Sequence, residues 1–153
     1  MRIVLRLVLL FAALWGAGKL VAGRLTEGDA STDEFSLAAV LGGLERRCRA
    51  TALCRGRVLA LCGGVQLDLR EATLAKNGGR LTVRAILGGV QVIVPAGWRV
   101  IVEADARAGG VDAGVTPPES LPADAPTLLV EAVARLGGIA VTSDDGPERA
   151  PAP

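Results

Sequence analysis

The sequence predicts an all-β fold, a right-handed β-solenoid of short stacked coils, preceded by one N-terminal membrane-directed α-helix. Three observations predict it: glycine pairs recur along the chain, apolar and polar residues alternate between them, and an apolar run occupies the N-terminus. The 153 residues, half of them apolar, suffice for one domain with a core. Because only 3% of them are aromatic, that core is expected to consist of small aliphatic side chains.

The N-terminal segment, residues 1–25, is expected to reach a membrane. It contains no acid, and residues 3–23 are uncharged except for Arg6 and Lys19, close to the roughly 20 apolar residues that a spanning helix needs. Long cationic side chains near the ends of such a helix reach the headgroups. A cleaved signal peptide and an amphipathic helix on the membrane surface are the alternatives. The expected location is the cell membrane, single-pass, or outside the cell after signal cleavage.

A short acidic linker is expected to separate this segment from a β-domain. Residues 26–34 read "TEGDASTDE", and the alternating apolar runs fall within residues 35–142. In 65–70, 90–94 and 98–104, every second residue is apolar, which is typical of half-buried strands. The residues predicted to face inward are Val65, Leu67, Leu69, Val90, Val92, Val94, Val100, Val102 and Ala104. The run 126–136 is the best helix candidate after residue 25, but it also fits a strand, whose inward residues are Leu128, Val130, Ala132 and Ala134. The tail, residues 143–153, is expected to be disordered.

Five glycine pairs lie between the apolar runs, 21 to 28 residues apart, and predict about four stacked coils with a corner at each pair. The longest interval contains four prolines over 115–126, which suit an excursion outside a sheet. Glycine suits a corner because it turns without a Cβ, tolerates positive φ and lets corners stack closely. The corner residues are Gly42, Gly43, Gly63, Gly64, Gly88, Gly89, Gly109, Gly110, Gly137 and Gly138. On this basis Gly64→Val or Gly89→Val should destabilise the domain. A phosphate-binding loop is disfavoured, because such loops lead from a strand into a helix.

Composition argues against several functional classes. The chain has no histidine and no tyrosine, so the commonest general base and the commonest zinc ligand are missing. We therefore predict no catalytic residues, no metal site and no cofactor. Four of the cations lie in residues 1–25, so the rest of the chain holds 13 basic (17 − 4) and 16 acidic residues. This charge balance does not favour the binding of nucleic acid.

Cysteines and carboxylates are given structural roles. Cys48, Cys54 and Cys62 match no zinc-binding spacing, and Cys54 and Cys62 are expected to pack as small buried side chains. A disulfide between two of the three would require an oxidising compartment. Outward strand positions are predicted for the acids Asp68, Glu71, Glu103, Asp105 and Asp112.

A basic run, "RRCRATALCRGR" at 46–57, contains five arginines. It fits a solvated edge of the first coil, where charge discourages edge-to-edge pairing. It also fits a patch for anionic lipid or an acidic partner. The patch residues are Arg46, Arg47, Arg49, Arg55 and Arg57.

Four phrases carry a resemblance: "LGGLERRCRA" (41–50), "LALCGGVQLDLREATL" (59–74), "ILGGVQVIVPAGWRV" (86–100) and "GGVD" (109–112). They resemble the C-terminal, or toastrack, domain of LiaF-type proteins of the cell-wall-active-antibiotics-response family. The resemblance covers residues 38–112 and, loosely, 127–142. The resemblance implies a β-solenoid that is fixed to the membrane and acts as a sensing or inhibitory partner of a histidine kinase in envelope-stress signalling. LiaF-type proteins carry several spanning helices before this domain, whereas this chain has one candidate.

The predicted function is therefore a membrane-tethered, non-enzymatic interaction or sensing module in the bacterial cell-envelope stress response. Expected partners are membrane lipid, through residues 3–23, and a membrane signalling protein such as a sensor kinase. The alternative is a structural solenoid scaffold that self-associates at the membrane as a homo-oligomer. No nucleic-acid partner is expected.

Overall fold

The computed structural model describes residues 9, 12–13, 17, 31 and 33–144, and within 33–144 more than half of the residues lie in β-strands. Ten strands and one short 3-10 helix follow in the order β1 (Glu34–Val40), β2 (Gly43–Arg47), β3 (Arg55–Leu61), β4 (Gly64–Asp68), β5 (Gly79–Ile86), β6 (Gly89–Val94), β7 (Arg99–Arg107), β8 (Gly110–Gly114), η1 (Pro118–Ser120), β9 (Thr127–Arg135) and β10 (Gly138–Ser143). The predicted N-terminal helix and most of the linker and tail lie outside the described residues.

The strands form two parallel five-stranded sheets. Sheet A has the order β1-β3-β5-β9-β7, and sheet B has the order β2-β4-β6-β10-β8. Because the chain alternates between the sheets, each odd strand and the even strand after it form one coil, and we number the coils 1 to 5 along the chain. The all-β, stacked-coil class is thus confirmed, while the handedness stays a prediction. The expected number of coils, about four, is wrong: residues 33–144 contain five.

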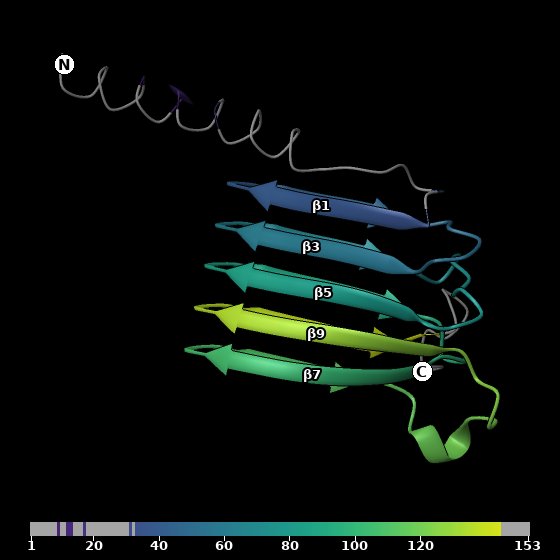
Figure 1. Ribbon diagram of the computed structural model, residues 1–153. Helices are drawn as coiled ribbons and strands as arrows, with labels where there is room; N and C mark the ends of the chain where they lie inside the picture. Colours follow the sequence, from purple (N-terminus) through teal and green to yellow (C-terminus); the bar gives the residue numbers. More distant parts are fainter. Residues whose placement is uncertain (1–8, 10–11, 14–16, 18–30, 32, 145–153) are drawn as a thin grey trace, which may run out of the picture.

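The coils are not stacked in the order of the chain. Coil 5 lies between coils 3 and 4, so that β9 pairs with β5 on one side and with β7 on the other. The proline-rich excursion, which includes η1, carries the chain from β8 back to the start of β9 (Figure 1). Coil 4 is consequently an end of the stack, although coil 5 follows it in sequence.

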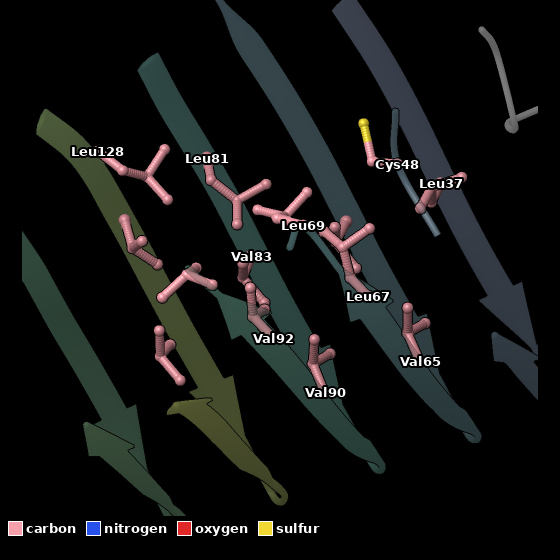
Figure 2. Packing of buried hydrophobic residues seen from close by; sticks show 14 of the residues in the cluster. Leu37, Cys48, Val65, Leu67, Leu69, Leu81, Val83, Val90, Val92 and Leu128 are labelled. Carbon is pink, nitrogen blue, oxygen red and sulfur yellow. The ribbon is translucent and has the colours of Figure 1, made fainter. Parts of the chain in front are cut away.

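The predicted alternation of faces is confirmed in the interior coils. Val65, Val90 and Val92 are at most 3% exposed, and their side chains meet those of sheet A between the two sheets (Figure 2). All four inward residues predicted for 126–136 are buried in β9. In β7 the prediction holds less well, because Val100 and Val102 are only half-buried and Ala104 is exposed. The reason is position: no described coil covers β7 on its far side.

In coils 2 to 5 the first glycine of the pair makes the close approach that stacking requires, whereas a Cβ at Gly42, in coil 1, would meet no atom within 4 Å. An added Cβ at Gly88 would collide with the carbonyl oxygen of Gly63 and lie 3.0 Å from its nitrogen. The same collision recurs at Gly63, Gly109 and Gly137, each against the first glycine of a neighbouring coil. Hydrogen bonds continue the sheet ladder through the corner, as in Gly89 N–H to Gly63 O at 3.1 Å.

The second glycine of each pair is not constrained in this way. A Cβ at Gly64 or Gly89 would meet no atom closer than 3.8 Å, which is ordinary van der Waals contact. Positive φ, expected at the glycines, lies instead on the residue before each pair. Those residues are Leu41, Cys62, Leu87, Ala108 and Leu136, with φ between 51° and 53°. The expected sensitivity of Gly64 and Gly89 to valine is therefore not supported by their surroundings.

Candidate interaction surfaces

The five arginines of the basic run do not form one patch. Arg47 lies on the outer side of sheet B beside Asp68, and Arg49 follows β2 and pairs with Glu71. Arg55 and Arg57 lie on the outer face of sheet A, in β3. Arg46 occupies an inward position of coil 1, in register with buried Leu67. The run separates because it crosses from sheet B to sheet A, and alternate strand positions face opposite sides.

Arg47 and Arg49 belong instead to an ion-pair cluster. The Arg70 guanidinium donates to both carboxylate oxygens of Asp68, at 3.0 and 2.8 Å, and Arg47 Nε lies 3.6 Å from Oδ2. Arg49 Nε donates to Glu71 Oε2 at 2.6 Å, and Arg47 Nη1 lies 3.5 Å from Oε1. The sequence predicted an outward strand position for Asp68. It does face outward, but it is only 8% exposed, since these arginines cover it.

This cluster is suited to holding coils together. Hydrogen bonds from Arg70, opposed by partial burial, hold the pKa of the Asp68 carboxyl below its usual value, so the carboxylate stays ionised. Arg70 Nη1 also lies 3.4 Å from Asp144 Oδ2, which joins coil 2 to the end of coil 5. In the described part of the chain, no group of three histidine, cysteine or acidic side chains could hold a metal ion.

A second basic surface, the arginine face, lies on the outer side of β3 and β5. It consists of Arg55, Arg57, Arg80 and Arg84, all exposed. Arg55 and Arg80 are register partners on adjacent strands, and Arg80 Nη1 lies 3.2 Å from Glu131 Oε1 in β9. Arg80 and Arg84 were not among the residues predicted for a basic patch. The alternation of 79–86 could have indicated them, because Leu81, Val83 and Ala85 are buried and the two arginines occupy the outward positions between and beside them.

On the same outer side of sheet A, acids lie on β9 and β7, the strands next to the arginine face. Glu103 and Asp105 are exposed in β7, and Glu131 in β9 is in register with both Glu103 and Thr82. The outer side of sheet A is therefore basic at β3 and β5, whereas at β9 and β7 three acids are balanced by the outward arginines Arg99, Arg107 and Arg135. The basic part of this surface favours an acidic partner.

The outer side of sheet B carries an open groove of about 930 Å³. The second glycines of all five corner pairs line it, together with Gln66, Gln91, Glu45 and Asp112. Gln66 and Gln91 are register partners at its centre. The groove contains no converging set of ionisable groups, so it offers surface for contact and no acid–base pair.

The cysteines are placed differently from the prediction. Cys54 and Cys62 were expected to be buried and are exposed, whereas Cys48 is buried. Cys62 is exposed because the chain turns at the corner and its side chain leaves the inward-facing series. Burial raises the pKa of the Cys48 thiol. All three thiols are free.

Comparisons with known proteins bear on one part of the chain. No curated protein and no solved structure matches it. Within the described residues, no helical segment has the length and hydropathy that a bilayer crossing requires, and the predicted anchor lies largely outside them. Residues 53–119, which comprise coils 2, 3 and 4 and end within η1, match the family model of the C-terminal domain of LiaF, described as cell wall-active antibiotics response. The resemblance inferred from the sequence is therefore confirmed over this segment.

Proposed function

We propose that this chain is a membrane-tethered, non-enzymatic interaction module of the bacterial cell-envelope stress response, with a sensor kinase as its partner. The match of residues 53–119 to the LiaF C-terminal domain is the observation that carries this proposal, because that family belongs to the response to cell-wall-active antibiotics. The tether is the apolar segment 3–23.

The surfaces of the domain support a binding role. The arginine face presents four exposed guanidinium groups on two adjacent strands, and acids follow on β9 and β7. Arginine pairs with carboxylates through a planar, two-pronged donor, which gives both attraction and orientation. The arginine face is therefore the surface to which we assign the kinase.

The experiment measures transcription of an envelope-stress reporter after treatment with a cell-wall-active antibiotic. Deleting the gene for this chain should change reporter induction several-fold, and unchanged induction would contradict a role in the response. Arg57→Glu and Arg84→Glu should each reproduce the deletion. Lys76→Glu is the matched control, since Lys76 is exposed on the loop before β5 and outside the arginine face. Its induction should stay at the wild-type level.

The end of coil 4 supports a second candidate, a self-associating scaffold. Among the described strands β7 pairs only with β9, and inward-facing Val102 is half-buried at this end of the stack. An uncovered edge strand is a template for pairing with another chain. Sedimentation of the full chain in detergent should then show oligomers. Val102→Lys should dissociate these oligomers, whereas Ile101→Lys, one residue away on the outward side, should leave them intact. A monomer at every concentration would contradict this candidate.

A further inference from the structure

One edge of the solenoid carries a row of apolar side chains that we call the corner ridge. It consists of the residues that precede the glycine pairs, in stacking order Leu41, Cys62, Leu87, Leu136 and Ala108. The strands of sheet A all point the same way, so these corners line up along one edge of the molecule (Figure 1). Leu87 is 53% exposed and Leu136 is 59% exposed. They are neighbours, since Leu87 N–H donates to Arg135 O at 3.1 Å.

Two features of Leu87 and Leu136 raise the free energy of the folded domain. Each has a left-handed backbone, with φ of 52° at Leu87 and 53° at Leu136, a conformation that glycine and asparagine adopt far more readily. Each also leaves more than half of a large apolar side chain exposed. Asparagine would relieve both costs and keep the corner. The left-handed backbone recurs at all five corners and belongs to the turn, but large side chains do not, since Cys62 and Ala108 occupy equivalent positions. Neighbouring exposed apolar side chains mark interaction sites, so the leucines indicate a contact beyond the described residues.

We propose that the corner ridge rests on the lipid bilayer, with its leucines among the upper acyl chains. The domain would then stand with its glycine corners toward the membrane and its arginine face to the side. This inference rests on the proposed tether. It adds a second membrane contact and fixes how the domain is oriented.

The chemistry of the ridge favours lipid over a protein partner. The ridge is the convex edge of a turn, and its amide N–H groups at Leu41, Cys62, Leu87 and Leu136 already donate to the neighbouring coil. It therefore offers aliphatic surface without directional hydrogen-bonding groups, which suits a fluid apolar phase.

Cations flank the same edge. Arg84, Arg107 and Arg135 lie within three residues of the ridge, against one acid, Asp105, which pairs with Arg135 at 3.3 Å. Arginine stems can lie along the apolar boundary while their guanidinium groups contact anionic headgroups. The charge beside the ridge on sheet A thus complements an anionic membrane.

The length of chain before β1 permits this orientation. Strand β1 has seven residues and runs toward its corner, so its first residue lies about 23 Å from the ridge at ~3.3 Å per residue. Residues 24–33 separate the apolar segment from β1 and, fully extended, reach roughly 33 Å. A chain anchored through residues 3–23 can therefore place the corner ridge at the bilayer surface.

Two native cysteines provide the test. Cys54 precedes β3 and Cys62 follows it, so the two exposed thiols mark opposite ends of one strand. The full chain is reconstituted into vesicles of phosphatidylethanolamine and phosphatidylglycerol and labelled with an environment-sensitive dye at Cys62 in Cys54→Ser, or at Cys54 in Cys62→Ser. Buried Cys48 remains. Quenching by lipids that carry a nitroxide high on the acyl chain should be at least threefold stronger at Cys62 than at Cys54.

Substitution of the leucines separates a membrane role from a structural one. Leu87→Asn and Leu136→Asn together should reduce quenching at Cys62 to the level at Cys54. The thermal midpoint should not fall, because asparagine favours the left-handed backbone. Ile101→Asn is the matched control: Ile101 is 47% exposed on β7 near the opposite end of the strands, so quenching at Cys62 should stay unchanged.

Three outcomes would overturn the inference. The first is equal quenching at the two cysteines, and the second is asparagine variants that melt earlier while quenching persists, which would make the leucines structural. The third is efficient Cys62-to-Cys62 crosslinking between chains without quenching, which would assign the ridge to a second copy. Failure of the tether is seen separately, since the full chain would then be absent from the vesicle fraction.

Discussion

Gly88 lies so close to Gly63 of the neighbouring coil that there is no room for a Cβ between them. The next residue, Gly89, would have its Cβ 3.8 Å from the nearest atom, the carbonyl oxygen of Gly138. Two adjacent glycines thus differ completely in what they tolerate. The difference arises because the first lies where coils touch backbone to backbone, and the second begins a strand whose outer side is open.

Gly88→Ala should destabilise the domain by roughly 3 kcal/mol or more, because a backbone collision has no flexible atom to move. Gly89→Ala should change stability by about 0.5 kcal/mol or less, as for an ordinary surface site. Denaturant unfolding of the two variants in detergent measures both. Equal losses would show that the corner is packed differently from the structure.

Val92→Asp should remove the folded domain, at a cost of about 4 kcal/mol or more, because Val92 is 0% exposed and packs within the apolar core, where a carboxylate would lose its hydration. Gln91→Asp places the same charge on the outer side of β6 and should be tolerated. Thermal unfolding followed by circular dichroism compares the pair. Similar melting of the two variants would mean that the assigned faces are wrong.

Acid should weaken the domain through Asp68. Its folded-state pKa is lowered, chiefly by the Arg70 hydrogen bonds, whereas in the unfolded chain it returns to about 3.9. The stabilisation is therefore fully present above about pH 4 and is lost as pH falls through the lower, folded-state pKa. Asp68→Asn should be less stable at pH 7 and lose less stability on acidification. Urea midpoints between pH 7 and pH 3 test this, with Asp112→Asn, exposed in β8, as the control that keeps the wild-type slope.

The full chain should sediment with membranes and resist both alkaline carbonate and high salt, if residues 3–23 form the anchor. Burial of some 20 apolar residues does not depend on ionic strength, whereas surface charge contacts are screened. Release by carbonate would indicate a helix lying on the surface. A mature N-terminus near Arg24 would indicate a cleaved signal and a secreted domain.

Local pattern was enough to predict most strand faces. The alternation at 65–70 and 90–94 places Val65 and Val92 in the core, because side chains of a strand necessarily point to opposite sides. Recurring glycines similarly indicated where coils approach one another. The run 126–136 fitted a strand as well as a helix by its pattern, and the structure makes it β9, with the four residues predicted to face inward buried.

Other features depended on which segments meet in space, and sequence order does not contain that information. Coil 5 pairs between coils 3 and 4 because parallel pairing requires matching edges and not adjacency in the chain. Asp68 is buried because Arg47 and Arg70 converge on it from two coils, and the arginines of 46–57 separate because their strands belong to different sheets. In the strands of the interior coils, the sequence by itself determined which side chains face the core, since that follows from the backbone repeat of a single strand. Only the tertiary structure decided which of the outward side chains become neighbours, since that depends on the order and register in which the coils stack.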